Sequence, residues 1–589
     1  MTLNKTKIVC TIGPSTSSYE KIVDLMKTGM NIARLNFSHG DHLGHLEVIK
    51  HLKKAREELN QPLAIMLDNK GPEVRIGNLP TPLHVIKGNL LFLTDKQQNN
   101  PQYVPIDPVS VLLKLEVGVK VLFDDGYIIS RVVEVKDNGV WVEIENEGEL
   151  SSHKGVNVPG VALDLPILTS ADLEDIRFGC EHDIDILAVS FIRSGEHVLK
   201  IKKVLKEFAK PEVLVIAKVE NYQGINNFDH ILKEADGIMV ARGDLGVEVP
   251  ISQVPRLQKE MIRKCFTAGK PAITATQMLE SMILHPRPTR AEVSDVANAI
   301  YDSTSCVMLS GETAMGQYPI EAVKVMSEII LDTEAYFNYQ DFFYSQMQSC
   351  YKDIPSAVTS ATVNTAYTTE ARAIFIYSST GYTPRLISKW RCSIPVIVLT
   401  HNPKVYHQLA LNWGIIPIYN PNFKSMKEAF KIISDYALDR KLVALGDTVV
   451  VTAGSSFGVL GSTNMMLVEN IGDVLIRGKS GYGNSVTEKV THLNSSDEKT
   501  ARPIKNQILV MSHCNDSYLT FLKEAKGIIL ENHADDIDSE KYAILVGKTL
   551  NIPVIVRAEG AVSLLKEGQE VTVDPKAFLV YNGTISLKS

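Results

Sequence analysis

Two stretches of the sequence decide the fold: VLVIAKVE at Val213–Glu220 and GIMVARGD at Gly237–Asp244. Each is a short apolar run that ends in charged or glycine residues. Buried parallel strands have nearly continuous apolar sequences, whereas half-exposed strands alternate apolar with polar residues. The two stretches therefore predict neighbouring strands of a parallel sheet, with their polar ends at one edge.

Six further runs of this kind occur in the first 315 residues, mostly separated by segments with helical periodicity such as Tyr19–Thr28 and Val254–Ala268. They are Lys7–Gly13, Asn31–Phe37, Leu63–Asn69, Ile186–Ile192, Pro271–Gln277 and Cys306–Glu312. Eight strands alternating with helices predict an α/β fold of the (β/α)8 TIM-barrel type. The active site of such a barrel lies at the carboxyl ends of its strands.

The interval between the third and fourth runs is too long for one loop of a barrel. Residues 71–161 contain strand-like runs with the turn signals Asp125-Gly126 and Asn138-Gly139 between them. They predict an all-β lid domain inserted into a barrel formed by residues 1–70 and 162–345. Such a domain can close over the site and exclude water.

The rest of the chain predicts three more parts. Residues 346–475 predict an α/β domain, which the family resemblance described below makes a regulatory one. Its expected strands are Ala373–Ser379, Pro395–Thr400, Ile415–Tyr419 and Thr448–Thr452. Residues 476–505 include a polar, Gly/Ser-rich stretch that predicts a linker. Residues 506–589 predict one more α/β domain.

Composition excludes several classes of protein. The 589 residues are 44% hydrophobic and 22% charged, which excludes a disordered or fibrous chain, and the net charge of −7 argues against a nucleic-acid partner. The seven cysteines are scattered, without a C-x-x-C pair, so neither a disulfide framework nor a zinc site is expected. With no run of 18 apolar residues and no apolar leader segment, the sequence predicts a cytoplasmic protein without a membrane partner.

Charged side chains at the strand ends suggest the chemistry. Lys218 and Glu220 share one strand face because strand residues alternate between faces, and we expect Arg242 and Asp244 to share one at the next strand end. Glu220 and Asp244 supply hard carboxylate oxygens for Mg²⁺, and Lys218 with Arg34 supplies positive charge for a phosphoryl group. For each strand end alone, a structural ion pair is the simpler explanation. The complete set converges on one face of a barrel, which favours a site.

Further oxygen and amide groups extend this set. Asn36, Ser38 and Asp68 can bind a second, monovalent cation. Gly243 allows a ligand to approach the backbone, and Thr276 offers a hydroxyl at the seventh strand end. Phosphoryl transfer by positioning and electrostatics is the simplest reaction that these groups serve.

Long motifs in a fixed order make residues 6 to about 475 resemble the pyruvate kinase family. They include TKIVCTIGPS (Thr6–Ser15), ARLNFSHG (Ala33–Gly40), LDNKGPEVR (Leu67–Arg75), KGVNVPG (Lys154–Gly160), AKVEN (Ala217–Asn221), GIMVARGDLGVE (Gly237–Glu248) and MLSGETA (Met308–Ala314). The resemblance implies transfer of the phosphoryl group of phosphoenolpyruvate to ADP, giving pyruvate and ATP, with Mg²⁺ (or Mn²⁺) and K⁺ as cofactors. It also implies a homo-oligomer, a tetramer as in the family.

The resemblance assigns roles residue by residue. Lys218 and Arg34 would contact the phosphoryl group, and Glu220 and Asp244 would bind the divalent metal. The substrate would meet the Gly243 amide and Thr276, and a water network near Thr276 and Ser310 would reprotonate the enolate. The K⁺ ligands would be Asn36, Ser38, Asp68 and the carbonyl of Asn69, and the nucleotide would contact Asn36, His39, Arg75 and Lys154.

Three positions bear on how closely the chain follows the family pattern. Asn69 stands where the family usually has Thr, and His153 replaces the first of two lysines in the lid motif. Glu73 resembles the K⁺-dependent members, since members with Lys at this position supply their own charge. We therefore expect K⁺ dependence.

Residues 378–383 are rich in hydroxyls around a glycine, directly after a predicted strand. Such a turn can present hydroxyl and amide groups to an anion, although a plain helix cap is the alternative. The resemblance places a sugar-phosphate or nucleotide effector here, bound by Ser378, Ser379, Thr380, Gly381 and Thr383. Lys389 and Arg391 follow, and a solvated surface is equally compatible with them.

From about Gln507 the chain resembles the phosphohistidine-type swivelling domain of phosphoenolpyruvate-utilising enzymes, through LNIPVIV, LKEGQEVTVD and VYNG (Leu550–Val556, Leu565–Asp574 and Val580–Gly583). The position of the phosphorylated histidine is occupied by Tyr542. We therefore expect a packing or interaction module that carries no phosphate, with His513 and His533 at the surface.

Two other function classes remain open at this point. One is a noncatalytic sensor that binds a sugar phosphate, which the loss of Lys218, Glu220, Asp244 or Thr276 would have favoured; all four are present. The other is a barrel lyase or aldolase acting on pyruvate-like enolates with Mg²⁺. Such an enzyme would need neither the lid motif nor the K⁺ ligands.

Overall fold

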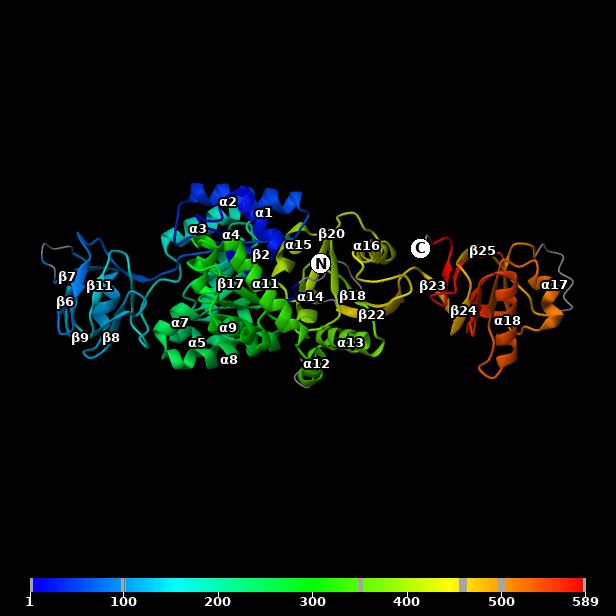
Figure 1. Ribbon diagram of the computed structural model, residues 1–589. Coiled ribbons are helices and arrows are strands. Elements are labelled where there is room, and N and C mark those ends of the chain that lie inside the picture. The colour runs from blue at the N-terminus through cyan, green and yellow to red at the C-terminus, as the bar shows by residue number, and fades with distance from the viewer. Residues whose placement is uncertain are drawn as a thin grey trace. The chain divides into compact units, whose positions relative to one another are not determined.

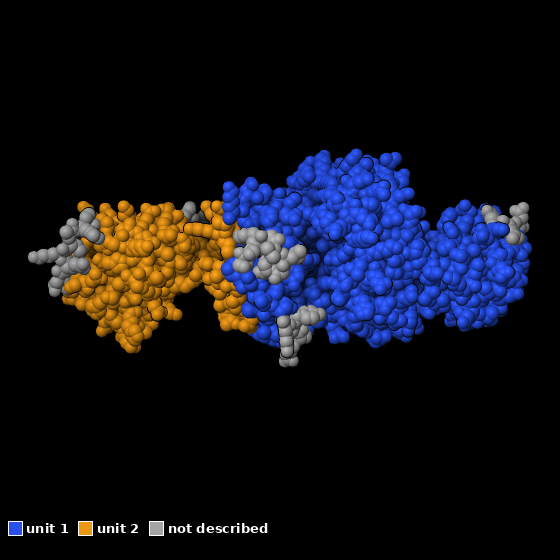
Figure 2. Space-filling view, turned by 180° about the vertical axis from the view of Figure 1, so that it is seen from behind, with its two compact units in different colours: residues 1–363, 376–424, 452–465 blue, residues 364–375, 425–451, 466–589 orange. Residues whose placement is uncertain are grey.

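The computed structural model describes residues 4–96, 100, 102–347, 353–454, 463–495 and 504–585 (Figure 1). The chain falls into two compact units (Figure 2). Residues 1–363, 376–424 and 452–465 form the first unit, and residues 364–375, 425–451 and 466–589 form the second. The border crosses the range 346–475, so the domain boundaries expected from the sequence stay a prediction.

Eight parallel strands form a closed barrel in the first unit, as predicted. In chain order they are β1 (Lys7–Thr11), β2 (Met30–Asn36), β3 (Ala64–Asp68), β13 (Ile186–Val189), β14 (Leu214–Val219), β15 (Gly237–Ala241), β16 (Ala272–Ala275) and β17 (Cys306–Leu309). The barrel closes by pairing of β1 with β17, with Lys7 opposite Cys306. All eight strands correspond to the predicted apolar runs.

Both faces of these strands are buried, which explains their continuous apolar sequences. Val9, Ile32 and Met66 belong to a cluster of mostly strand residues, whereas Ile8, Cys10 and Ala33 pack with residues of the surrounding helices. The helices of this part are α1 (Tyr19–Thr28), α2 (His42–Glu58), α3 (Ser170–Glu181), α4 (Gly195–Glu207), α5 (Tyr222–Asn226), α6 (Phe228–Glu234), α7 (Arg242–Glu248), α8 (Val254–Ala268), α9 (Arg290–Tyr301), α10 (Gly311–Ala314) and α11 (Pro319–Ala335). Helices α1 and α8 have the predicted bounds.

A second closed barrel, the lid barrel, lies between β3 and β13 in the chain. Its strands are β4 (Val74–Ile76), β6 (Leu90–Thr94), β7 (Tyr103–Asp107), β8 (Lys120–Phe123), β9 (Ile128–Lys136), β10 (Gly139–Ile144) and β12 (Gly155–Asn157). A separate pair is formed by β5 (Leu83–Val85) and β11 (Gly148–Leu150). The inserted segment is therefore all-β, with a core of its own.

A five-stranded sheet follows in the order β20-β19-β18-β21-β22. Its strands are β18 (Ala373–Tyr377), β19 (Val396–Thr400), β20 (Ile415–Tyr419), β21 (Thr448–Gly454) and β22 (Thr463–Asn470), and the helices of this region are α12 (Tyr339–Met347), α13 (Ile354–Thr368), α14 (Tyr382–Ser388), α15 (Pro403–Gln408) and α16 (Met426–Asp439). The sequence predicted four of these strands but not β22, whose side chains are largely half-buried or exposed.

The second unit contains an eight-stranded sheet in the order β23-β30-β29-β25-β26-β27-β28-β24. Its strands are β23 (Val474–Arg477), β24 (Ser480–Tyr482), β25 (Val486–His492), β26 (Ile508–Met511), β27 (Gly527–Leu530), β28 (Val554–Val556), β29 (Glu570–Asp574) and β30 (Leu579–Asn582). The helices α17 (Leu519–Leu522), α18 (Ile537–Leu550) and α19 (Ala561–Leu564) accompany it. This confirms an α/β tail.

The linker expected over 476–505 is wrong for most of its described length, because β24 and β25 lie there, within the sheet. The glycines of this stretch serve close packing. A Cβ at Gly478 would lie 2.3 Å from Ile555 Cγ2, and a Cβ at Gly481 would lie 2.7 Å from the Pro575 carbonyl oxygen. Residues 496–503 of the expected linker lie outside the described residues.

Candidate active site

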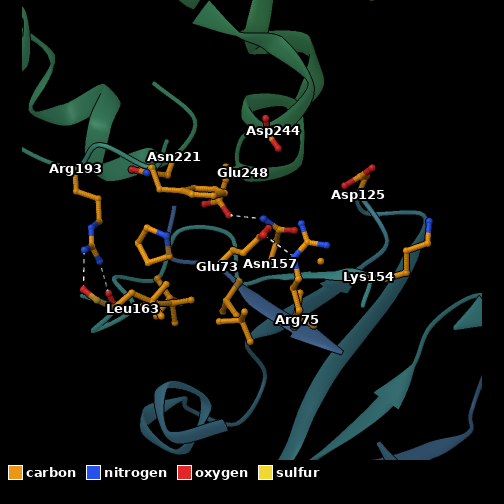
Figure 3. Close-up of a pocket in the computed structure, with 18 of the residues that line it drawn as sticks. Glu73, Arg75, Asp125, Lys154, Asn157, Leu163, Arg193, Asn221, Asp244 and Glu248 are labelled. Carbon is orange, nitrogen blue, oxygen red and sulfur yellow. Dashed lines mark hydrogen bonds and ion pairs between the residues drawn. The ribbon is translucent and has the colours of Figure 1, made fainter. Parts of the chain in front are cut away.

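A cavity of about 540 Å³ lies between the lid barrel and the carboxyl ends of the large barrel's strands, both in the first unit (Figure 3). The lid barrel contributes Arg75, Asp125 and Lys154 to its lining, and the large barrel contributes Asp244 and Asn221. Charged side chains thus face the cavity from both sides, at the end of the barrel where the sequence placed the site.

Lys218, near the end of β14, is buried and ion-paired. Its Nζ lies 2.9 Å from Glu220 Oε1 and 3.1 Å from Asp68 Oδ1. Burial lowers the pKa of Lys218, but the nearby carboxylates of Asp68 and Glu220 outweigh this effect and raise it. The ammonium group therefore stays charged in a dry site.

Arg34 on β2 approaches the same carboxylate from the other side. Its Nε donates to Asp68 Oδ2 at 2.6 Å, and its Nη1 donates to Thr11 Oγ1 at 2.9 Å. Burial raises the pKa of Asp68, but Lys218 and Arg34 together lower it below its usual range. Asp68 is thus a fully buried carboxylate between two cations, which orients both.

Glu220 and Asp244 have the properties of a divalent-metal site. Glu220 Oε2 accepts the Phe191 N–H at 2.6 Å, and burial, opposed by Lys218 and reinforced by Asp244, raises the pKa of Glu220. Asp244 lines the cavity and has no hydrogen-bond or ion-pair partner within the described part of the chain. Two neighbouring carboxylates, one of them unpaired, fit a hard cation completed by substrate and water. No cluster of three or more His, Cys, Asp or Glu ligands occurs among the described residues.

The predicted K⁺ ligands come together at the ends of β2 and β3. Asn36 lies directly opposite Asp68 in the strand register. Asn36 Oδ1 accepts the Ser38 N–H at 3.2 Å, and the Asn69 carbonyl oxygen accepts the Ser190 hydroxyl at 2.7 Å. Each of these oxygens keeps a further lone pair, so the set fits a monovalent cation.

Thr276 is held in the left-handed region, with φ of 68°. Arg242 donates to its carbonyl at 2.6 Å and is itself clamped by Asp295 through two contacts of 2.6 and 2.8 Å. Thr276 Oγ1 accepts the Gly243 N–H at 2.9 Å. The two groups predicted to meet the substrate are therefore adjacent.

The prediction that Arg242 and Asp244 share a strand face is wrong. Strand β15 ends at Ala241, and helix α7 begins at Arg242. The two side chains follow the helix, so Arg242 turns to Asp295 whereas Asp244 faces the cavity. The sequence did not predict a role for Asp295, because its partner Arg242 lies 53 residues earlier in the chain.

Ser310 follows β17. Its backbone N–H donates to the buried Glu312 at 2.7 Å. Its Oγ is buried and has no hydrogen-bond partner among the described residues. An unsatisfied buried hydroxyl is costly unless a water or ligand completes it.

Of the predicted nucleotide ligands, Arg75 and Lys154 line the cavity from the lid barrel and His39 lines it from the large barrel. Lys154 Nζ is 2.9 Å from Asp124 Oδ1, and Arg75 pairs with Glu73 at 2.5 Å (Figure 3). Asn36, the fourth predicted contact, lies at the end of β2. The exposed His153 sits beside Lys154, with its carbonyl accepting from Arg75 at 2.6 Å.

The predicted effector turn caps a short helix. Ser378 Oγ accepts the Gly381 N–H at 3.1 Å, and Thr380 Oγ1 accepts the Tyr382 N–H at 3.4 Å. Gly381 has φ of 73°, and the hydroxyls of Thr383 and Thr463 are hydrogen-bonded. Lys389 and Arg391 do not form a solvated surface: both are buried, and Arg391 Nη2 donates to the Ser303 carbonyl at 2.6 Å.

The described part of the tail shows where the residues discussed for a phosphohistidine lie. Tyr542 packs in α18 against the tail core. His513 and His533 are exposed, as predicted, with His513 Nδ1 3.0 Å from Asp536 Oδ2. An imidazole is thus absent from the position that the resemblance assigns to it.

Comparison with known proteins identifies the family. Residues 3–323 match the family model for the pyruvate kinase barrel domain, and residues 356–469 match that for the pyruvate kinase alpha/beta domain. The pyruvate kinase of Geobacillus stearothermophilus is 42% identical over 592 residues, which cover 99% of each chain. The chain belongs to the pyruvate kinase family. The pyruvate kinase of Bacillus licheniformis, 39% identical over 99% of this chain and 100% of its own, agrees.

Membership of the pyruvate kinase family makes the protein a phosphotransferase. Its tail also has a match, since residues 503–577 fit the model for the mobile domain of phosphoenolpyruvate-utilising enzymes. The Geobacillus and Bacillus pyruvate kinases share the full length, tail included. Among the described residues, no helix is both long and apolar enough for a membrane span.

Proposed function

We propose that this enzyme transfers the phosphoryl group of phosphoenolpyruvate to ADP, giving pyruvate and ATP, and that it requires Mg²⁺ and K⁺. The observation that carries the proposal is the buried Lys218 ammonium, held against Asp68 and Glu220, the latter bonded to the amide of Phe191, which lines the cavity. A fixed cation in a dry site stabilises the charge that develops on a transferring phosphoryl group.

The cationic side chains would bind the substrate and ADP and stabilise the transferring phosphoryl group. Lys218 and Arg34 bind the phosphoryl oxygens of the substrate, since Asp68 orients both. Glu220 and Asp244 would hold Mg²⁺, which when bound neutralises negative charge on the substrate oxygens. Arg75 and Lys154 meet the phosphates of ADP from the lid side, with His39 and Asn36 completing the nucleotide site.

Protonation of the enolate is assigned to the other side of the site. The Gly243 amide and the Thr276 hydroxyl orient the enolate. Ser310 Oγ holds a water molecule, and this water gives its proton to the enolate carbon. The unsatisfied, buried hydroxyl of Ser310 supports this assignment. Arg242 holds Thr276 in its left-handed conformation for the same step.

K⁺ would bind to Asn36, Ser38, Asp68 and the Asn69 carbonyl. Glu73 supports the K⁺ requirement because its carboxylate stands where other members carry a cationic lysine, and it also pairs with Arg75. Asn69 stands at the usual Thr position, and its carbonyl oxygen, which accepts the Ser190 hydroxyl, would use its second lone pair for K⁺.

Regulation is the remaining part of the proposal. Ser378, Ser379, Thr380, Gly381 and Thr383 would bind the phosphate of a phosphorylated metabolite, supported by their turn around a left-handed glycine. The chain would act in the cytoplasm as a homotetramer, as the family resemblance implies. The tail would carry no phosphate, since Tyr542 cannot accept it as an imidazole does.

The test is pyruvate formation from phosphoenolpyruvate and ADP with Mg²⁺, with and without K⁺, for the wild type and Lys218→Met. We expect K⁺-dependent activity that falls at least about a thousandfold in the variant, since electrostatic contributions of several kcal/mol are lost. Activity without K⁺ would overturn the role of Glu73 alone. No activity, even with sugar phosphates and AMP present, would favour a noncatalytic sensor instead.

A further inference from the structure

A chain of buried hydrogen bonds connects Lys218 with helix α3. Lys218 Nζ donates to Ser190 Oγ at 2.7 Å, and Ser190 Oγ donates to the Asn69 carbonyl at 2.7 Å. Asn69 Nδ2 donates in turn to Asp172 Oδ1 at 2.7 Å. Ser190, Asn69 and Asp172 are each at most 3% exposed, so water does not compete for these bonds.

Ser190 completes the coordination of the lysine. An ammonium group has three protons; Lys218 Nζ donates hydrogen bonds to Asp68 and Ser190 and forms an ion pair with Glu220. The two carboxylates have other partners as well, because Asp68 also holds Arg34 and Glu220 also accepts the Phe191 amide. Ser190 is the shortest and only uncharged of the three contacts, and it gives the flexible lysine a fixed third point.

The position of Ser190 is itself tightly determined. Its backbone N–H donates to Asn69 Oδ1 at 2.9 Å, so Asn69 holds both the main chain and the hydroxyl. A Cβ at Gly71 would lie 2.7 Å from Ser190 Cβ, so the backbone at Gly71 packs closely against Ser190.

Asp172 joins this network to the entrance of the lid. It caps α3 with Thr169, and its Oδ1 also accepts the Gly71 N–H at 2.9 Å. Gly71 stands where the chain leaves the large barrel for the lid barrel. The lysine, the first helix after the lid and the first residues of the lid are thereby connected through Asn69.

We propose that Ser190 is a positioning residue for phosphoryl transfer, which fixes the direction of the Lys218 ammonium and is itself fixed by Asn69 and Asp172. The inference rests on the proposed role of Lys218. Without the hydroxyl, one ammonium proton and the Asn69 carbonyl lose their partner, and the lysine moves toward the carboxylates. A displacement of about 1 Å at such a group costs roughly a hundredfold in rate.

The experiment compares two reactions of the full chain, for wild type and Ser190→Ala. The first is pyruvate formation from phosphoenolpyruvate and ADP with Mg²⁺ and K⁺. The second is exchange of the pyruvate methyl protons with D₂O under the same ions, which needs the enolate-protonating groups but no phosphoryl transfer. We expect kcat of the first reaction to fall about 10- to 100-fold, with KM for ADP and the exchange rate within twofold of wild type.

Ser130→Ala is the matched control. Ser130 is equally buried, and its Oγ donates to the Val121 carbonyl at 2.8 Å within the lid barrel, away from Lys218. We expect both of its reactions to stay near the wild-type rates. Ser190→Cys keeps the shape of the side chain, with a larger atom and a weak hydrogen-bonding group, and protects the test against a folding defect of Ser190→Ala.

Three results would overturn the inference. The first is a kcat of Ser190→Ala within twofold of wild type, and the second is full activity of Ser190→Cys. The third is a parallel loss of both reactions in Ser190→Ala and Ser190→Cys, because this indicates general damage to the site. In all three the wild type still forms pyruvate, so the proposed function stands; an inactive wild type would instead refute the proposed function and this inference with it.

Discussion

At the scale of single residues, the Arg242–Asp295 pair is the contact on which the conformation of Thr276 depends. The partly buried Arg242 lies between Asp295 and the carbonyls of residues 275–277. In Asp295→Ala the guanidinium loses its two short charged contacts, and Thr276 is free to leave the left-handed region. We expect kcat/KM for phosphoenolpyruvate to fall about tenfold, measured by steady-state kinetics. Asp229→Ala, which breaks an exposed pair with Lys264, is the control and should leave kcat/KM unchanged.

A half-buried histidine predicts the acid sensitivity of the protein. His407 Nδ1 accepts the Leu63 N–H at 3.3 Å, and burial, reinforced by the charge of Arg56, lowers the pKa of His407 to about 4. The unfolded chain, with a histidine pKa of about 6.5, binds more protons than the folded one between these values. Stability is therefore fully present above pH 6.5 and decreases as the pH falls toward 4.

We expect the free energy of unfolding of His407→Gln, followed by urea denaturation, to decrease less steeply over this range than that of wild type. His533→Gln, at an exposed histidine, should keep the wild-type slope. Equal slopes for all three proteins would contradict the assignment to His407.

Single residues also show what the sequence conveys about the site. The charged groups Lys218, Glu220 and Asp244 stood out because charge at the end of an apolar strand is rare. Ser190 did not stand out, because a serine has no such signal, and its role appears only once strands β3 and β13 place it beside Asn69. Hydrogen-bond partners distant in the sequence are the part that pattern alone does not supply.

At the scale of elements, one side chain secures the return of the chain from the lid barrel. Arg193, which follows β13, donates to the carbonyls of Leu163 at 3.0 Å, Leu165 at 2.7 Å and Pro166 at 2.9 Å (Figure 3). In Arg193→Ala these contacts are lost and the lid side of the cavity is less well held. We expect KM for ADP to rise several-fold with little change in kcat, measured by initial rates at saturating phosphoenolpyruvate.

Arg131→Ala tests whether the effect is specific to this contact. Arg131 pairs with Glu145 within the lid barrel and does not touch segment 163–166. Its KM for ADP should remain at the wild-type value. A similar rise in both variants would mean that any loss of arginine from this part of the protein weakens nucleotide binding.

The elements show where composition is informative and where it misleads. Continuous apolar runs located every strand of the large barrel, because burial on both faces leaves a strong pattern. The glycines near Gly478 and Gly481 suggested a flexible linker, yet they permit strands β23 and β24 to approach neighbouring backbone and side chains closely. Flexibility and close approach require the same residue, so glycine content alone does not distinguish them.

At the scale of the whole molecule, ligands that bind only the folded enzyme should stabilise it. At about 100 times its Kd, a ligand adds roughly 2.7 kcal/mol. We expect phosphoenolpyruvate with Mg²⁺ and K⁺ to raise Tm by a few degrees in differential scanning fluorimetry, and EDTA to remove most of the shift. Asp244→Asn should lose it, whereas Asp229→Asn should retain it. An undiminished shift in Asp244→Asn would contradict the placement of the metal.

The connection of the two barrels has a consequence for how the chain folds as it is made. The lid barrel is complete within residues 74–157, so each of its strand pairings joins residues of that segment alone. The large barrel closes only when β1 meets β17, about three hundred residues later. Structures with local contacts form faster, and during synthesis the earlier parts fold first. During synthesis the lid barrel is therefore already folded, while β1, β2 and β3 still lack the strands that close the large barrel.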